Sequence, residues 1–494
     1  MKIESVPEQK TFLVVFKAGK LFDLPWFWYT VIALTIVVVR ALGNPIQLGL
    51  PFISDDLRYF FLAKTTPPFY IFTACIQFFF RPVVHSLYWL LFHSIGTNFV
   101  GVHLTLIVLH AGLAVLVAAF FRRLTKAPIL LVAPVVIFWG VFGGYDEVFY
   151  FTSSFATELM GAWFTVLSLL FFLRHLDDEG PFWMVPICLI FAYGSKESSI
   201  VILPLMALLC LWRRKLPHRW IIKLIILLIP TLAYLVLEYY LQVVVSQSFR
   251  KSNLKFYYLG WHIFRNFGQM LVIVSGGSIW LNLSWIWRGI LAVLLFSLTI
   301  WLGRREGLIA FLMLLVMILP FGIKTTVLVE NDTRHIYMPA MLWGLLLLTA
   351  SNRLVSHWGK QGIIAVVLWI FAVANMASGI IWVNLRYQHY QYEISFIEVI
   401  LCQVNPELEQ TQRSIPLWGY NLFDPGLLPI LNAVYFNDRL IDLSGLTPEE
   451  AAQKAAELGY DPPRALSWEK SDDGSMNGKN LWRTLPQGEV FQGK

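Results

Sequence analysis

The sequence predicts an all-α polytopic membrane protein, and two observations carry that prediction. The first is composition, because 57% of the 494 residues are hydrophobic and only 14% are charged, with a mean hydropathy of +0.62. A soluble domain is closer to half apolar and about a quarter charged. The second is that the apolar residues form long runs separated by short polar loops, as in helices that cross a bilayer.

A helix needs roughly 20 apolar residues to cross the hydrocarbon core, and about eleven runs meet or approach this length. The predicted spans are residues 26–43, 99–121, 128–143, 155–173, 182–195, 198–212, 219–241, 286–302, 306–323, 336–351 and 363–383. The fifth and sixth are short for complete crossings, so we expect them to be tilted or partly re-entrant. Two further short apolar stretches, residues 67–80 in the first outer loop and residues 263–274, are predicted to be interfacial or re-entrant helices.

Basic residues in the short loops predict the orientation of the chain. With eleven crossings, one side receives Lys2, Lys10, Lys17, Lys20, Arg122, Arg123, Lys126, Arg213, Arg214, Lys215, Arg304 and Arg305. An excess of lysine and arginine marks the cytoplasmic side. We therefore expect a cytoplasmic N-terminus and an extracytoplasmic C-terminus. The loop 246–285 places basic residues on the outside, against the trend, but long loops contribute less to topology.

The composition changes after residue 383, where no further apolar span follows. Residues 1–383 are predicted to form the transmembrane domain, and residues 384–494 a small extracytoplasmic domain. Within the latter, residues 393–404 and 448–458 are expected to be helical. The second of these helices has Thr447 as its expected N-cap, with Glu449 and Glu450 in its first turn.

The positive charges indicate membrane topology and not a nucleic-acid partner, and membrane lipid is the expected partner of such a chain. The net charge is +7, but the positive charges punctuate apolar runs and form no stripe. The four cysteines have no metal-ligand spacing, and three of them lie in apolar segments. His103 and His110, seven residues apart on one face of the second span, are expected to be buried and hydrogen-bonded. We expect no required cofactor, and a divalent metal held by carboxylates stays an alternative that no ligand set indicates.

Acidic and basic residues from four separate loops fall on the predicted outer face. They are Asp55 and Asp56 (LPFISDDLRYF), Asp146 and Glu147 (GGYDEVFY), Lys196 and Glu197 (AYGSKESS), and Arg334, His335 and Tyr337 (NDTRHIYMP). Charges beside a bilayer are costly unless they are paired or serve a function. A carboxylate can take the proton of an acceptor hydroxyl that attacks an anomeric carbon, and a lysine or arginine can neutralise a phosphate leaving group. The set therefore suits transfer of a sugar from a lipid phosphate.

Each motif also has a simpler interpretation. Asp55 and Asp56 could cap an interfacial helix, with Arg58 as an i,i+3 partner. Asp146 and Glu147 could be a solvated loop pair. Lys196 and Glu197 could belong to structural ion pairs, although adjacent residues rarely pair with each other on a helix. Arg334 could anchor the chain among lipid headgroups.

The order of the motifs resembles the GT-C superfamily of integral membrane glycosyltransferases. It is most similar to the protein O-mannosyltransferases and to the transmembrane O-mannosyltransferases with tetratricopeptide tails. An acidic pair follows the first span, and an Arg-Pro motif at Arg81 (FFRPVVHSLYWLLFH) leads to a histidine-bearing second span (VGVHLTLIVLH). The remaining matches are Asp146 and Glu147 before the fourth span, Ser195-Lys196-Glu197 between two short spans, and Arg334, Tyr337 and Pro339 at a late span. The resemblance covers roughly residues 26–350.

The resemblance implies an inverting transfer from a polyprenyl-phosphate sugar, with Asp55 as general base and Asp56 as the alternative. It implies that Asp146 and Glu147 orient the acceptor or support the base. Lys196 and Arg334 would hold the donor phosphate, with His335 and Tyr337 beside them, and Arg58, Arg81 and Glu197 would support the site. Related enzymes often need no metal. Two departures concern the acceptor: the tail has no 34-residue period, and Gly-Gly-Tyr precedes Asp146 where the closest relatives would have His-Pro.

We therefore expect a glycosyltransferase of a bacterial inner membrane that acts on its extracytoplasmic face. The donor would be a polyprenyl-phosphate sugar, and the acceptor a glycan, lipid or protein. One alternative is a transporter or flippase of lipid-linked sugars that uses the acidic residues for coupling. Such a protein would carry ionisable residues at mid-span and often inverted repeats. A second alternative is a ligase or acyltransferase that uses the same acids on another lipid-linked substrate.

Overall fold

A computed structural model of the chain describes most of the predicted transmembrane domain and part of the C-terminal region. The described residues are 24–43, 48–50, 52, 55–68, 80–145, 147–241, 256–276, 284–324, 333–381, 414–417, 434, 439–443, 446–460, 464–466 and 482–484. Of the predicted elements, residues 69–79 of the stretch 67–80 and the helix at 393–404 lie outside the described residues.

Long apolar helices dominate the described part of the chain. Seven are long and apolar enough to cross a membrane, by length and composition: Pro25–Leu42 (α2), Phe99–Thr125 (α6), Thr152–Leu176 (α9), Trp220–Tyr239 (α12), Ile286–Pro320 within α15, Thr333–Trp358, which includes α16, and Gln361–Ile381. Three predicted spans coincide with shorter helices, Ile129–Gly140 (α7), Met184–Tyr193 (α10) and Ile202–Arg213 (α11). The helical character predicted for the membrane part is thus confirmed, whereas the eleven crossings and the GT-C-like fold stay predictions.

The longest helical segment, α15 (Trp285–Lys324), is two helices joined by a sharp turn. Arg304 has non-helical backbone angles of φ 53° and ψ −130°. Phe296 and Phe311 would be about 22 Å apart along a straight helix, yet their ring centroids are 5.4 Å apart. The two halves therefore pack side by side as a hairpin, and they coincide with the predicted spans 286–302 and 306–323.

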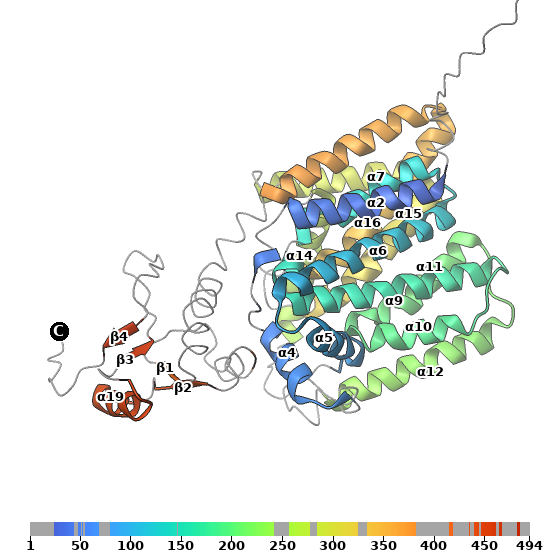
Figure 1. The fold of residues 1–494 in the computed structure, drawn as a ribbon. Helices are drawn as coiled ribbons and strands as arrows, with labels where there is room; N and C mark the ends of the chain where they lie inside the picture. The colour runs from blue at the N-terminus through green and yellow to red at the C-terminus, as the bar shows by residue number, and fades with distance from the viewer. Residues whose placement is uncertain are drawn as a thin grey trace, which may run out of the picture.

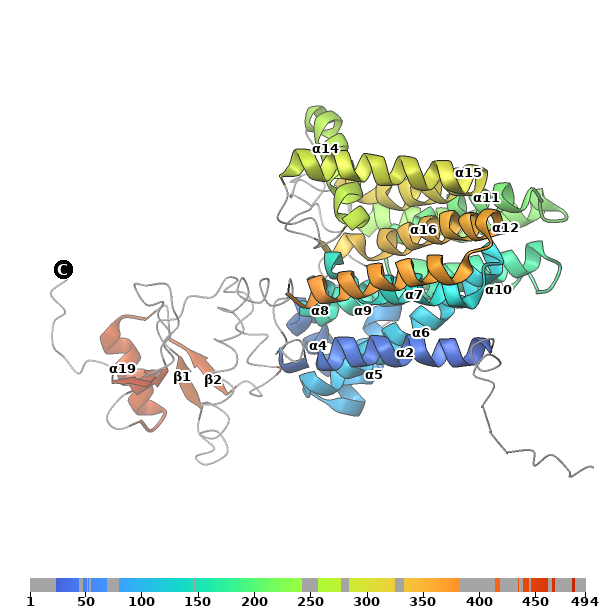
Figure 2. The same cartoon turned by 90° about the horizontal axis from the view of Figure 1, so that it is seen from above.

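The long helices lie roughly parallel in one bundle, and long helices that follow each other in the chain run in opposite directions (Figures 1 and 2). In this bundle α6 packs against α2, α7 and α9, and α16 (Tyr337–Trp358) packs against α7 and α15. The connections consequently collect at two ends. One, the α4 end, holds α4 (Asp55–Thr65), α5 (Pro82–Ile95) and the beginning of α9. The other, the Arg122 end, holds the end of α6 and the beginning of α7.

Short elements complete the α4 end. The turns η2 (Gly143–Tyr145), η3 (Glu197–Val201) and η7 (Thr333–Ile336) and the short helix α8 (Glu147–Tyr150) connect the longer helices there. The helix α14 (Phe256–Gly276) contains the stretch 263–274 and is longer than the short element predicted for it. It packs against α15 and α16 and contacts η2 and η7.

The C-terminal region contains a four-stranded sheet that the sequence analysis did not predict. The strand order is β2-β1-β3-β4, with β1 (Ile415–Leu417) parallel to both β2 (Leu440–Asp442) and β3 (Arg464–Leu466), and β4 (Trp482–Thr484) antiparallel to β3. The predicted helix at 448–458 is confirmed as α19 (Pro448–Glu457). Thr447 and Glu450 form a reciprocal capping box at its start, which satisfies two otherwise unpaired backbone N–H groups.

Candidate functional site

The Asp56 carboxylate accepts hydrogen bonds from the beginning of α9. The backbone N–H groups of Thr152 and Ser153 donate to Asp56 at 3.1 and 2.6 Å. These are among the N–H groups that lack partners within the helix, and the helix dipole favours a negative charge at this position. Burial raises the pKa of the Asp56 carboxyl to about 6, and the hydrogen bonds from Ser153 and Thr152 limit the rise. Asp56 therefore joins α4 to α9 through a buried contact.

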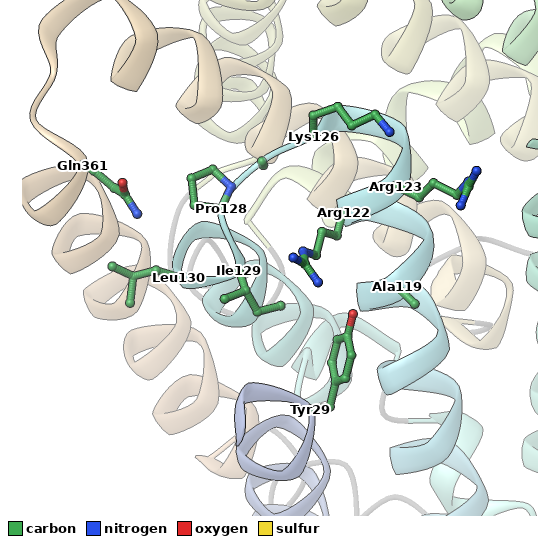
Figure 3. A pocket seen from close by; sticks show the side chains of 10 residues that line it. Tyr29, Ala119, Arg122, Arg123, Lys126, Pro128, Ile129, Leu130 and Gln361 are labelled. Atoms are coloured by element: carbon green, nitrogen blue, oxygen red, sulfur yellow. The ribbon is translucent and has the colours of Figure 1, made fainter. Parts of the chain in front are cut away.

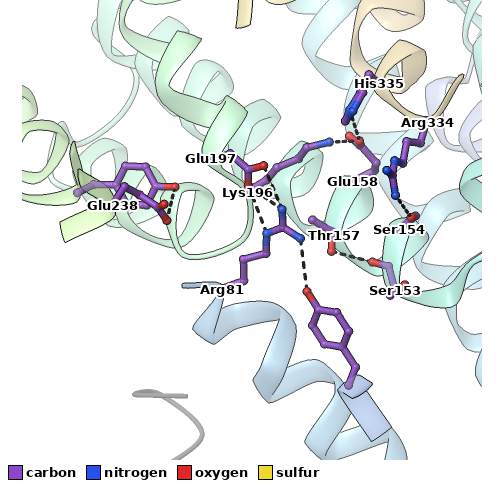
Figure 4. Close-up of polar contacts among 12 residues, drawn as sticks. Arg81, Ser153, Ser154, Thr157, Glu158, Lys196, Glu197, Glu238, Arg334 and His335 are labelled. Carbon is purple, nitrogen blue, oxygen red and sulfur yellow. Dashed lines mark hydrogen bonds and ion pairs between the residues drawn. The ribbon is translucent and has the colours of Figure 1, made fainter. Parts of the chain in front are cut away.

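One face of the first turns of α9 gathers the predicted basic residues (Figure 4). The Arg334 guanidinium donates to the Ser154 hydroxyl at 3.3 Å. One turn further, Glu158 forms an ion pair with Lys196, and the His335 Nδ1 atom lies 3.8 Å from the same carboxylate oxygen. Glu158 and Lys196 have side chains only 3% and 6% exposed. The structure thus brings Lys196, Arg334 and His335 together, as the sequence predicted, around an acid that the sequence analysis did not select.

A glycine permits the close approach of Lys196 to α9. A Cβ atom added at Gly161 would lie 3.1 Å from the Lys196 Cβ atom, which is tighter than ordinary van der Waals contact. Gly161 lies three residues after Glu158 and so on the same side of the helix. The absence of a side chain at this position therefore lets the lysine stem lie against α9 and reach the Glu158 carboxylate.

Arg81 and Glu197 form a second, separate ion pair at the α4 end. The Arg81 Nη2 atom lies 2.8 Å from a Glu197 carboxylate oxygen, and Arg81 also donates to the Tyr59 hydroxyl. Arg81 and Glu197 are partly buried. The contact joins the start of α5, η3 and α4, so the adjacent residues Lys196 and Glu197 each pair with a different, distant residue. Each charge of the Ser-Lys-Glu motif therefore has an ion-pair partner of its own.

Tyr337 belongs to a different cluster from the one predicted for it. His110 Nε2 lies 2.9 Å from the Gly140 carbonyl oxygen, which only accepts, so Nε2 carries the proton of the neutral ring. His110 Nδ1 is then the acceptor for the Tyr337 hydroxyl, 2.6 Å away. Since its proton is engaged and its side chain is fully buried, Tyr337 has no hydroxyl proton left for a phosphate. Its placement thus opposes the phosphate-binding role, while His110 is hydrogen-bonded as expected.

Arg40 fixes the end of α7 near this cluster. Its guanidinium donates to the carbonyl oxygens of Gly140 at 3.2 Å and Phe142 at 3.1 Å, and it lies 3.9 Å from the centroid of the Phe149 ring. Carbonyl groups at a helix C-terminus lack partners within the helix and attract cations. A buried arginine in the last turn of α2 is therefore satisfied by the end of α7 and by an aromatic face.

All buried charged side chains of the described residues lie at the α4 end. They are Arg40 in the last turn of α2, Asp56 in α4, Glu158 in the second turn of α9, Lys196 before η3 and Glu238 in the last turn of α12. Glu238 accepts a hydrogen bond from the Tyr234 hydroxyl at 3.1 Å. Charges are costly inside a bilayer unless they are paired. Their collection at one end marks this end as the candidate site.

Several predicted residues have side chains outside the described part. Asp55 is the first residue of α4 and Glu147 the first of α8, but only their backbones are described, and Asp146 lies outside the described residues. Arg58 is partly buried in α4. Among the described residues, no group of three or more His, Cys, Asp or Glu side chains could hold a metal ion.

Glu158, Arg40 and Ser154 were not among the residues predicted from the sequence. A signal existed for the first two, because each is a lone charge within a predicted span, and such a residue is a functional candidate by default. Ser154 has no comparable signal, since serines are common in apolar helices.

Comparisons with protein-family models, with curated proteins and with solved structures find no match. The resemblance to the GT-C superfamily therefore stays a prediction, and the chemical interpretation depends on the arrangement of these residues.

Proposed function

We propose that this chain is a membrane-embedded glycosyltransferase that transfers a sugar from a polyprenyl phosphate to an acceptor at the α4 end. The observation that carries the proposal is the cluster of Lys196, Arg334 and His335 on the first turns of α9. Three potentially cationic groups beside one helix suit a phosphate that must gain negative charge as it leaves. By the positive-inside rule this end faces the extracytoplasmic side, in the inner membrane of a bacterium.

In the proposed reaction Asp55 removes the proton of the acceptor hydroxyl as its oxygen attacks the anomeric carbon. The bond between that carbon and the phosphate oxygen breaks, and the polyprenyl phosphate leaves with the electron pair, so the anomeric configuration inverts. Lys196 and Arg334 neutralise the leaving phosphate. His335 lies close enough to Glu158 to share this carboxylate when Lys196 turns to the phosphate. No step requires a metal.

The contacts of Asp56 decide which of the two adjacent acids we assign as the general base. Its carboxylate is buried and accepts two backbone N–H groups at the start of α9. An acid held in this way is poorly placed to reach an acceptor hydroxyl, so we assign Asp56 to positioning α4 and Asp55 to catalysis.

The location of the buried charges favours this function over a transporter. A carrier that couples transport to protons is expected to bind at mid-membrane, beside interrupted helices. In the described part of the chain, the buried Arg, Lys, Asp and Glu side chains lie at one end of the bundle. That location suits a reaction between a lipid-anchored donor and an acceptor that arrives from water.

Replacement of Asp55 tests the proposed function. In Asp55→Asn we expect turnover of a polyprenyl-phosphate sugar to fall about 10²–10⁴-fold, the contribution typical of a general base. Donor affinity should be unchanged, because the asparagine retains the size of the side chain and the cationic cluster is intact. Turnover and donor binding would be measured on purified full-length protein with a panel of polyprenyl-phosphate sugars.

Asp56→Asn is the matched control, since it makes the same chemical change one residue away. We expect it to lower thermal stability while the turnover of folded protein stays within a few-fold of wild type. The reverse result, with turnover lost only in Asp56→Asn, would show that Asp55 is not the base. If the wild-type protein binds or moves a donor without consuming it, the transporter function replaces the proposed one.

A further inference from the structure

A cavity lies at the Arg122 end, opposite the candidate site. It has a volume of about 610 Å³ and is lined by the start of α2, the end of α6, the start of α7 and the start of the helix Gln361–Ile381. In Figure 3 the Arg122 guanidinium and the Tyr29 hydroxyl point toward each other in the cavity, and the Gln361 amide borders it. The cavity is therefore lined by three basic side chains, one hydroxyl and one amide, all of which can hydrogen-bond to an anion.

The positive charge of this cavity is only partly neutralised within the described part of the chain. Of its three basic residues, Arg123 pairs with Asp177 at 3.0 Å and with Glu179 at 2.6 Å. Neither Arg122 nor Lys126 has an ion-pair partner among the residues that the structure describes. Two cations that line one cavity thus have no acidic partner among the described residues.

Lys126 ends α6 in an unusual backbone conformation. Lys126 follows the last residue of α6 with φ 58°, a left-handed conformation in which glycine or asparagine is the usual residue. A lysine costs conformational energy there. Basic residues near the end of α6 are favourable for the helix dipole, but Arg122 and Arg123 in the last turn already supply that interaction.

The surroundings of the cavity favour a lipid over a soluble anion. Its wall includes Ile129 and Leu130. Next to it, α2 and the helix Gln361–Ile381 present exposed aliphatic side chains such as Leu34 and Ile363. Trp28 and Trp369 place these two helices in contact, with ring centroids 6.2 Å apart. A phosphate in the cavity would therefore have apolar helix surface beside it for acyl chains.

We propose that this cavity binds the phosphate headgroup of an anionic membrane lipid, held by Arg122 and Lys126. The acyl chains would lie on α2 and the helix Gln361–Ile381. Clusters of basic residues at the ends of membrane helices bind anionic headgroups with about 1 kcal/mol per cation. The site is separate from the candidate active site and does not depend on the proposed glycosyltransferase function.

The test measures binding of phosphatidylglycerol to the purified full-length protein by native mass spectrometry. In the double variant Arg122→Gln/Lys126→Gln we expect the affinity to fall about 30-fold, as the loss of two such cations implies. The matched control is Arg214→Gln/Arg219→Gln, which removes two exposed arginines with the same left-handed conformation at the same end, outside this cavity. The control is expected to bind as wild type does.

Three results would overturn the proposal. The first is equal affinity for zwitterionic phosphatidylcholine, which would remove the role of charge. The second is binding of inorganic phosphate as tight as that of the lipid, which would make the ligand a soluble phosphate. The third concerns a second cavity of about 700 Å³ at this end, lined by Arg304, Arg353 and His357 among others. If Arg353→Gln abolishes lipid binding while the Arg122 and Lys126 variant retains it, the site is that cavity.

Discussion

The contact between Glu158 and Lys196 has two separable consequences, one for stability and one for chemistry. Both side chains are almost completely buried, and the His335 Nδ1 atom lies 3.8 Å from the Glu158 carboxylate. Removing one partner of a buried ion pair leaves an uncompensated charge, at a cost of roughly 3–5 kcal/mol, whereas replacing both partners by uncharged residues is often nearly neutral. A pair of substitutions can therefore distinguish a structural lysine from a lysine that binds substrate.

We expect Lys196→Met alone to lower the thermal unfolding temperature markedly, because Glu158 loses its partner. In the double variant Lys196→Met/Glu158→Gln, stability should return close to the wild-type value while binding of a polyprenyl-phosphate sugar stays weak. Thermal unfolding and donor binding would be followed on the same samples. Recovery of donor binding in the double variant would restrict Lys196 to a structural role.

At the residue scale, the sequence predicted that certain basic residues lie close together, but it did not predict their ion-pair partners. Lys196, Arg334 and His335 were predicted to lie together from their position in loops on one side, and they do. The partner of Lys196 was not predicted, because the pairing joins two elements 38 residues apart and depends on how α9 and α10 pack. Tyr337 was grouped with Arg334 because they are close in sequence, although the start of α16 directs the tyrosine toward His110.

At the scale of elements, α9 organises the α4 end of the bundle. Its first backbone N–H groups bind Asp56 of α4, Ser154 binds Arg334 of η7, and Glu158 binds Lys196 before η3. Three connections that are distant in the sequence are thereby fixed to less than two turns of one helix. A change in the packing of this segment should therefore alter the positions of all three connections.

Gly161→Ala tests this packing. Alanine is a better helix former than glycine by about 1 kcal/mol, but at this position its methyl group would lie 3.1 Å from the Lys196 Cβ atom. We expect lower thermal stability and weaker donor binding, because the lysine must move away from α9.

The control for this substitution is Gly289→Ala in α15, where an added Cβ atom meets nothing within 4 Å. It is expected to leave stability unchanged or to raise it slightly through helix propensity. If the two variants have the same unfolding temperature and the same donor affinity, close packing at Gly161 does not position Lys196.

The predicted spans agree with the helices because hydropathy determines both. The first predicted span, residues 26–43, corresponds to α2 at Pro25–Leu42, and the turn at Arg304 falls between the predicted spans 286–302 and 306–323. The sheet in the C-terminal region was missed for a physical reason. Each strand has only three residues, which is too short for a period of two to be recognised.

At the scale of the whole molecule, the two ends of the bundle differ in how their charges are held. At the α4 end, Lys196 pairs with Glu158, and Arg40 and Asp56 bond to backbone groups at the ends of other helices. At the Arg122 end, the basic residues are more exposed, and several have no acidic partner among the described residues. The first arrangement suits a preorganised reaction site, and the second suits contact with anionic headgroups.

The turn within α15 is a place where the chain can be cut without loss of the fold. Each half of this hairpin contains its own apolar run, and the halves are held by side-chain packing such as that of Phe296 against Phe311. A break at Arg304 would therefore sever the peptide bond without removing the contacts. Two polypeptides, residues 1–303 and 304–494, should assemble when produced together and co-purify through an affinity tag on one of them. A break in the middle of α9, after residue 164, should prevent assembly, because it interrupts a helix that most of the site requires.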